Sequence, residues 1–370
     1  MIYSFNDRNI LKTSYEYSEI NFQTVLIFGQ LQAYKHRFHI SHNHDYNSFN
    51  MLSLSVEKNN GEVNLNEIID LVKLSSEHLH HNALGDHAWL DLTQGGRSSI
   101  AGYIAKETGH SHIVGYAQIS QGSSSWALEY VIHPGHYDDC VQIGTLLLKH
   151  ALEEIKIHGG GHVHVWVPKP DHNSDLIAFN NNMSKGRQVM QMRLDITDLK
   201  SPQPAEVFQQ SLNAKFQNTE FTISSLKTKQ DESDWLELNN AAFGQHPEQG
   251  NWDQEIFNQR KNSDWFDAEG LLLCRHRDSK LLSASCWVKI HNHHQNRFGE
   301  IYVIAVSPHF QGQKLGKMML EAGLVFMKSR QLDSAMLYVD STNVKAIGMY
   351  EKFGFIKDHN DQAYVIDMPQ

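Results

Sequence analysis

Two segments of the chain repeat one order of apolar and polar positions. In each, an apolar stretch rich in Val, Ile and Tyr runs to a proline, a polar loop ends in glycine, and an amphipathic stretch leads to a second apolar one. The segments cover residues 128–167 and 299–340. The apolar stretches predict β-strands, which end near Pro134 and Pro308 because proline cannot donate to a strand ladder.

The amphipathic stretch of each segment predicts a helix, because apolar residues recur there at intervals of three and four. Further helices are expected upstream, over about residues 65–81 and 231–242, each followed by a pair of strands. Two such units about half a chain apart predict a duplicated α/β domain. The helical positions are Leu146, Leu147, His150 and Ala151 in the first segment and Met318, Met319, Ala322 and Val325 in the second.

A length of 370 residues also favours two domains over one. Pro202 and Pro204, set among polar residues, indicate a linker between them. The expected parts are an N-terminal extension of unknown role (1–48), a first domain (49–197), the linker (198–215) and a second domain (216–370).

Composition narrows the class of protein further. A net charge of −10 argues against a nucleic-acid surface, which needs clustered Lys and Arg. The sequence holds no apolar run of about 18 residues and no signal-peptide pattern, so we expect no membrane contact and a cytoplasmic location. The three cysteines form no CxxC, and the histidine clusters at 36–44 and 78–81 are interpreted as compositional bias. Neither a disulfide framework nor a metal site is therefore expected.

The loop of the second segment has the pattern of an anion site. It reads Gln-Gly-Gln-Lys-Leu-Gly over residues 311–316 and opens directly into the predicted helix. Unpaired N–H groups and the positive end of the helix dipole favour a pyrophosphate at such a position. Any helix start with glycines shares these features, so the loop alone is a weak signal.

Together with the strand and helix predicted after it, this loop resembles the GNAT superfamily of N-acetyltransferases. The loop matches the family's Q/R-x-x-G-x-G/A pattern except that Lys314 takes the place of the first glycine, and residues 343–355 match N-x-x-A-x-x-x-Y-x-x-x-G-F. The resemblance implies an α/β (α+β) fold of two tandem GNAT domains, each a mixed, mostly antiparallel sheet flanked by helices. It also implies acetyl-CoA as cosubstrate and no metal.

Four further stretches resemble the mycothiol synthases, a family of tandem GNAT proteins. They are HPEQGNW at 246–252, KIH at 289–291, GEIYV at 299–303 and LYVD at 337–340, and the similarity spans roughly residues 50–370. That family acetylates the cysteinyl amine of cysteinyl-glucosaminyl-inositol, so a small-molecule amine acceptor and a monomeric enzyme are expected. Two alternatives stay open: another small amine, such as an aminoglycoside or polyamine, and an acetyl-CoA-sensing binding protein.

The resemblance also implies roles for individual residues. Glu300 resembles the general base and Tyr350 the acid that protonates the leaving thiolate; a solvent-facing carboxylate and a core aromatic are the plain alternatives. The implied substrate contacts are Asp86, Glu248, Lys289, Glu300 and Tyr338. The implied acetyl-CoA contacts are Ile304, Ala305, Val306, Gln311, Gly312, Gln313, Lys314, Leu315, Gly316, Lys317, Asn343, Val344, Lys345, Ala346, Ile347 and Gly348.

The first segment departs from this pattern. Its loop, at 134–144, is two residues longer between proline and glycine and carries Asp138 and Asp139, which would repel a pyrophosphate. Glu129 is interpreted as the counterpart of the second segment's glutamate, but no N-x-x-A-x-x-x-Y pattern follows the strand at 164–167. We therefore expect a degenerate, non-catalytic first domain.

Overall fold

The described residues of the chain, in the computed structural model, are 52–59, 64–79, 81–94, 99–122, 125–198, 212, 216, 220–244, 250–293 and 296–369. The expected N-terminal extension, most of the expected linker and Glu248 lie outside these ranges, and so does the side chain of Asp86. Leu52–Gln370 form one unit. Within the described ranges, no helix is long and apolar enough to cross a membrane.

Twelve strands of the described chain form a single sheet in the order β1-β2-β3-β4-β5-β12-β6-β11-β10-β9-β8-β7. The strands are β1 (Leu54–Asn59), β2 (Ser99–Glu107), β3 (Ile113–Gln121), β4 (Trp126–Ile132), β5 (Gly161–Val167), β6 (Ser184–Asp195), β7 (Phe221–Ser225), β8 (Leu271–His276), β9 (Leu282–His293), β10 (Asn296–Val306), β11 (Ser334–Asp340) and β12 (Ile356–Met368). The helices are α2 (Leu65–Leu79), α3 (Asp86–Gln94), α4 (Cys140–Ile157), α5 (His172–Asn180), α7 (Lys229–Ala242), α8 (Gln254–Lys261), α9 (Leu315–Ser329) and α10 (Val344–Lys352).

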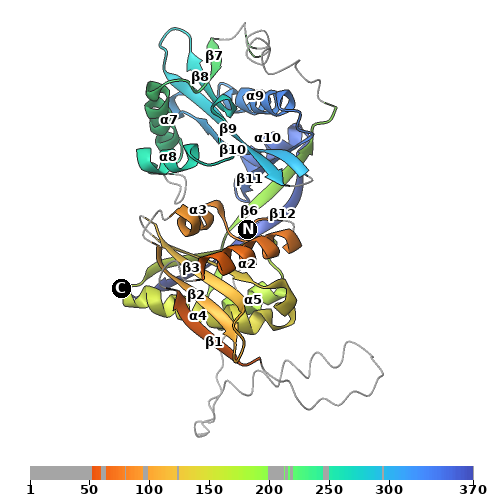
Figure 1. Cartoon of the computed structure of the whole chain (residues 1–370). Helices are drawn as coiled ribbons and strands as arrows, with labels where there is room; N and C mark the ends of the chain where they lie inside the picture. The colour runs from red at the N-terminus through yellow and green to blue at the C-terminus, as the bar shows by residue number, and fades with distance from the viewer. Residues whose placement is uncertain are drawn as a thin grey trace, which may run out of the picture. The chain divides into compact units, whose positions relative to one another are not determined.

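The two halves of the sheet repeat one topology (Figure 1). In each, four antiparallel strands (β1–β4 or β7–β10) are followed by a parallel neighbour, β5 or β11. A helix, α4 or α9, connects the two parallel strands, as a parallel pair requires. The predicted α/β (α+β) class, with two mixed and mostly antiparallel GNAT-like halves, is confirmed.

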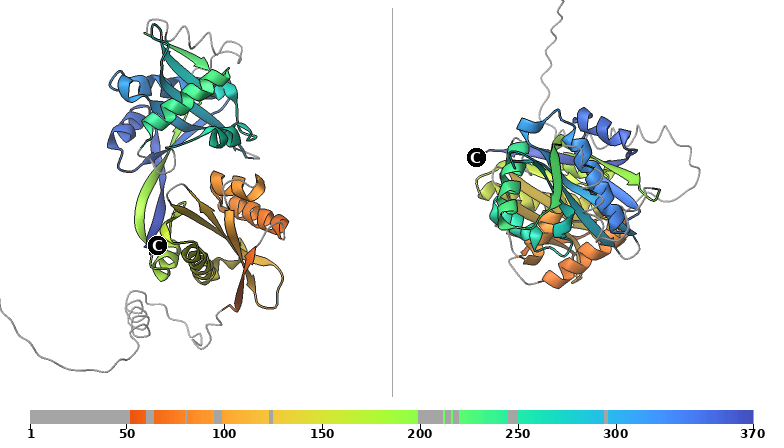
Figure 2. Two further views of the ribbon diagram at one scale, coloured as in Figure 1. Left: turned by 90° about the vertical axis from the view of Figure 1, so that its left-hand side faces the viewer. Right: turned by 90° about the horizontal axis from the view of Figure 1, so that it is seen from above.

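The last strand of each half is exchanged between the halves. β6 follows the first half in sequence but pairs with β11 over seven residues, from Ser334↔Asp195 to Asp340↔Val189. β12 ends the chain but pairs with β5, also over seven residues. The two exchanged strands run antiparallel beside each other, as the pair of long ribbons between the halves in Figure 2 shows. The sheet is therefore continuous across the predicted domain boundary.

Each half buries one face of its connecting helix in its own apolar core. Leu147 and Ala151 of α4 are fully buried in one core, and Met319 and Ala322 of α9 are fully buried in the other. These residues lie at the predicted spacing, which confirms the two amphipathic helices. Leu146, His150, Met318 and Val325 are half-buried at the borders of the same faces.

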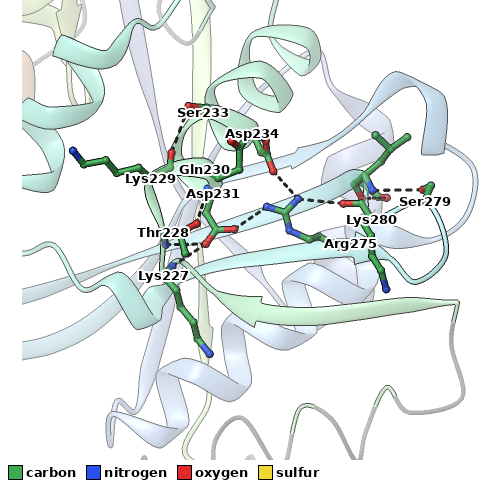
Figure 3. A network of polar contacts seen from close by, with 12 residues as sticks. Lys227, Thr228, Lys229, Gln230, Asp231, Ser233, Asp234, Arg275, Ser279 and Lys280 are labelled. Atoms are coloured by element: carbon green, nitrogen blue, oxygen red, sulfur yellow. Dashed lines mark hydrogen bonds and ion pairs between the residues drawn. The ribbon is translucent and has the colours of Figure 1, made fainter.

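Polar contacts hold the first turn of α7 against β8 (Figure 3). The Thr228 side chain accepts from the backbone N–H of Asp231, and Asp231 accepts in return from the N–H of Thr228, which makes a capping box. Arg275 of β8 pairs with Asp231 at 2.8 Å and with Asp234 at 2.7 Å. The helix begins at Lys229, two residues before the start predicted from the sequence.

Candidate active site

The second half opens a gap in its sheet at the parallel strand pair. β10 and β11 pair over three positions only, from Gly299↔Ala335 to Ile301↔Leu337. A register shift on β10 between Ile301 and Val303 leaves Tyr302 as a bulge. Beyond it, the backbone of β10 keeps β9 on one side while β11 turns away. Residues Ile301 to Ile304 line a cavity of about 2240 Å³ there.

The loop before α9 turns twice through left-handed backbone. Gly312 has a φ of 82° and Lys314 a φ of 62°, and α9 begins directly after, at Leu315. Lys314 thus holds the conformation that glycine adopts without strain. A Cβ at Gly312 would meet no atom within 4 Å, so the backbone angle, not crowding, favours glycine there. The loop presents the first N–H groups of α9, as an anion site requires.

α10 brings a tyrosine to the wall of the same cavity. The side-chain oxygen of Asn343 accepts from the N–H of Ala346 at 3.1 Å and so caps the helix. Two turns later, Tyr350 is buried and lines the cavity. Burial, followed by the nearby thiol of Cys286, raises the pKa of Tyr350 to about 12. The phenol therefore keeps its proton at neutral pH and can donate it.

Glu300 of β10 lies in the cavity wall beside the bulge. Its carboxylate is buried, and Oε2 accepts from Nε2 of His291 on β9 at 2.6 Å. Lys289 stands opposite Glu300 in the strand register, and its ammonium lies 4.9 Å from the ring centroid of Trp265 and 5.7 Å from that of Tyr302. The wall thus brings together a carboxylate, an imidazole and an ammonium.

The exchanged strands complete this wall. Tyr338 of β11 accepts from Nε2 of Gln191 on β6 at 2.7 Å, and Gln191 accepts in turn from Nε of Arg193 at 3.0 Å. Desolvation, followed by the negative charges of Asp361 on β12 and of Glu300, raises the pKa of Tyr338. No sequence pattern indicated Gln191, Arg193 or Asp361, because only the exchange of strands places them at this cavity.

The predicted site residues divide into two groups. Lys289, Glu300, Ile304, Tyr338, Asn343, Ala346 and Tyr350 line the cavity. The second group lies outside the lining. In it, the loop residues Gln311 to Lys314 are exposed, as are Lys317 of α9 and Val344 and Lys345 of α10. Ala305 and Leu315 are buried, and Val306, Gly316, Ile347 and Gly348 are half-buried. Asp86 begins α3, whose neighbouring residues Gly85 and Ala88 line the same cavity.

The first half repeats this frame without its functional groups. Leu128 of β4 pairs with Ile119 of β3 and with Val165 of β5. Ile301 of β10 stands in the same place, because it pairs with Val288 of β9 and with Leu337 of β11. The residue before each therefore corresponds as well, so Ala127 occupies the position of Glu300. The interpretation of Glu129 as that counterpart is wrong, because Glu129 pairs with Gln118 at the next position after Leu128. It therefore corresponds to Val303, which pairs with Trp287 just after the bulge. Glu129 instead accepts from the N–H of Gly85 at 2.6 Å.

The counterpart of α10 is also present, although no sequence pattern indicated it. α5 follows β5 with Asp171 as its cap, where Asn343 caps α10. A Cβ on Gly144 would meet Ile177 of α5 at 2.7 Å, and a Cβ on Gly316 would meet Met349 of α10 at 3.8 Å. This correspondence places Ala178, the residue after Ile177, at the position of Tyr350.

The turned loop before α9 has no equivalent in the first half. α4 already begins at Cys140, four residues before Gly144, whereas α9 begins one residue before Gly316. The preceding residues Pro134–Asp139 form a 3₁₀ turn, and residues 134–144 contain no positive φ. Helix thus fills the space where the second half has its loop.

Comparison with known proteins shows the relatives of this chain. The Acetyltransferase (GNAT) family model matches residues 233–355. A mycothiol acetyltransferase of Acidimicrobium ferrooxidans is 32% identical over 293 residues, which are 78% of this chain and 89% of that protein. Another, of Stackebrandtia nassauensis, is 32% identical over 302 residues, or 80% of this chain and 94% of that protein.

Solved structures share the tandem fold at low identity. A GCN5-related N-acetyltransferase from Sphaerobacter thermophilus has a TM-score of 0.61 at 15% identity and covers 86% of this chain and 96% of its own. A tandem GNAT protein from the clavulanic acid biosynthesis pathway has a TM-score of 0.62 at 14% identity. The match covers 86% of this chain and 100% of that one. At this identity the likeness concerns the fold alone.

Proposed function

Because the chain belongs to the mycothiol acetyltransferase family and is an acetyl-CoA-dependent N-acetyltransferase with the GNAT fold, we propose that it acetylates the cysteinyl amine of cysteinyl-glucosaminyl-inositol. The observation that carries the proposal is the wall of polar groups beside the bulge of β10. Glu300, Lys289 and Tyr338 face one cavity there, next to the gap between β10 and β11. A cation with many hydroxyls needs such hydrogen-bonding partners.

In the proposed reaction, Glu300 acts as the general base. It removes a proton from the acceptor's ammonium, through a water molecule, so that the amine nitrogen can form a bond to the acetyl carbon. Tyr350 gives its proton to the sulfur as the carbon–sulfur bond breaks. The nitrogen then loses its second proton, which yields the neutral amide and restores the phenol of Tyr350. Such positioned acids and bases typically contribute about 10²–10⁴-fold in rate. The cosubstrate supplies only the activated acetyl group.

The chain's own backbone would hold the cosubstrate. The backbone of Ile304, Ala305 and Val306 pairs with β9 but not with β11. Its β11 side suits the pantetheine arm, and one N–H there can polarise the thioester carbonyl. The N–H groups of the turned loop, Gln311–Gly312–Gln313–Lys314, and of Leu315, Gly316 and Lys317 at the start of α9 suit the pyrophosphate. The first residues of α10, from Asn343 through Val344, Lys345, Ala346 and Ile347 to Gly348, lie beside this gap.

The acceptor contacts would come from both halves. We assign Lys289, Glu300 and Tyr338 to the acceptor from their place in the cavity wall, and Glu248 and Asp86 from the sequence pattern alone. A cytoplasmic location, a monomeric state and the division at residues 197 and 216 stay predictions.

A panel of acceptors tests the proposed substrate. With acetyl-CoA, we expect kcat/KM for cysteinyl-glucosaminyl-inositol to exceed the values for glucosamine, an aminoglycoside and spermidine by about 100-fold or more, because each polar group left unmatched costs about 1–3 kcal/mol. A higher kcat/KM for a simple amine would favour the alternative, an acetyltransferase for another small amine, while the acetyltransferase assignment would survive.

The first half has Ala127 and Ala178 at the positions of Glu300 and Tyr350, and helix in place of the loop. We therefore expect one acetyl-CoA site per chain. Calorimetric titration should give a stoichiometry near one. Lys314→Glu places a negative charge on the turned loop and should raise the Kd for acetyl-CoA at least about tenfold. Gln142→Glu, at the matching distance before Gly144, should leave the Kd unchanged. Two equal sites, or equal effects of the two substitutions, would contradict a single site in the second half.

A further inference from the structure

His291 forms a hydrogen bond with Glu300 that no sequence pattern indicated. The Nε2–Oε2 distance is 2.6 Å, and both side chains are about nine-tenths buried. The two residues stand diagonally across the β9–β10 pair, since His291 faces Phe298 and Lys289 faces Glu300 in the register. A carboxylate can only accept, so the Nε2–H of His291 is the donor.

The histidine ring is itself fixed in place. It stacks on the ring of Phe298, with centroids 4.5 Å apart and planes inclined by 12°. The guanidinium of Arg193, from the exchanged strand β6, lies 5.4 Å from the same phenylalanine centroid. The ring therefore holds one orientation, and a hydrogen bond donated from it restricts the rotation of the carboxylate.

We propose that His291 is a positioning residue for the acetyl-transfer reaction: it holds Oε2 of Glu300 and so directs the other carboxylate oxygen toward the acceptor's ammonium. The inference rests on the proposed role of Glu300 as general base. The neighbouring cation, Lys289, lies against the rings of Trp265 and Tyr302. We therefore assign it to contact with the acceptor. A base held within a narrow range of orientations avoids the loss in rate that misplacement brings.

Two substitutions of His291 separate positioning from packing. His291→Phe keeps a ring that can stack on Phe298 but removes the donor, and His291→Gln restores an Nε2–H donor at nearly the same distance from the backbone. We expect His291→Phe to lower kcat about 10- to 100-fold with the KM for acetyl-CoA changed less than about twofold. His291→Gln should recover most of that loss. His276→Phe on β8 is the matched control, because His276 also lies against a phenylalanine, Phe221 at 5.5 Å, and does not line the cavity.

A double-mutant cycle with Glu300→Gln decides between the explanations. If His291 acts through the carboxylate, His291→Phe should cost nothing further in the Glu300→Gln background. The inference is overturned if His291→Phe keeps the wild-type kcat, or if Phe and Gln variants lose equally and the loss persists in that background. A Glu300→Gln variant with wild-type kcat would instead refute the general-base assignment, so the two failures are distinguishable.

Discussion

Glu300→Gln should lower kcat for acetyl transfer by about a hundredfold or more near neutral pH, with little change in the KM for acetyl-CoA. Glutamine keeps the size of the side chain and can accept from His291, but it cannot take a proton from the acceptor. A general base contributes about 10²–10⁴-fold, and the loss should fall within that range. Steady-state kinetics with both substrates varied measures it.

The first half supplies the control for this experiment. Glu129→Gln changes another carboxylate of the same cavity. Glu129 accepts from the N–H of Gly85, and it does not occupy the strand position that corresponds to Glu300. It should leave kcat within about threefold of the wild-type value, because no proton transfer is assigned to it. A Glu300→Gln variant as active as the wild type would show that another group, or solvent, accepts the proton.

The sequence predicted the parts of the fold that local chemistry determines. The loop before α9, the helix after β11 and the buried positions of α4 and α9 each depend on neighbours within a few residues, so their patterns are legible in one chain. Lys314 illustrates the limit: its departure from the family pattern was visible, but only the φ of 62° shows that the backbone keeps the shape that glycine would give.

The sequence could not predict what pairing over long separations determines. The strand register places Ala127, not Glu129, at the position of Glu300, and the β-bulge at Tyr302 gives β10 one residue more than β4 between that position and the following proline. Likewise, α5 carries none of the residues of α10 that the family pattern names, although Gly144 packs on it as Gly316 packs on α10. The packing is thus common to the two halves, whereas the residues of the family pattern occur in α10 and not in α5.

The exchange of β6 and β12 lies furthest from any local signal, because neither strand alternates regularly and neither sequence identifies its partner. Nothing in residues 184–195 indicates pairing with residues 334–340 rather than with the nearer β5. The exchange nevertheless decides the composition of the cavity wall, since it places Gln191 against Tyr338 and joins Arg187 to Asp340 at 2.9 Å.

From this exchange we expect that the second half, expressed as residues 206–370, neither folds stably nor binds acetyl-CoA. The fragment lacks β6, so β11 loses a seven-residue partner and becomes an open edge. It also lacks Met192 and Ile196, which are almost fully buried in the core of the second half. Burial of each such side chain stabilises a protein by about 1.5–3 kcal/mol, which is a large share of a typical net stability of about 5–15 kcal/mol.

A fragment of residues 184–370 is the matched comparison, because it adds β6 back and leaves the rest of the first half out. It should be soluble and should melt cooperatively by circular dichroism, and calorimetry should detect one acetyl-CoA site. Since β5, the partner of β12, is still absent, its stability should stay below that of the full chain. Co-expression of residues 1–205 with 206–370 should likewise restore binding, because the missing strand then returns in trans. If residues 206–370 alone fold and bind acetyl-CoA as the full chain does, the exchanged strand is dispensable and the second half is an autonomous domain.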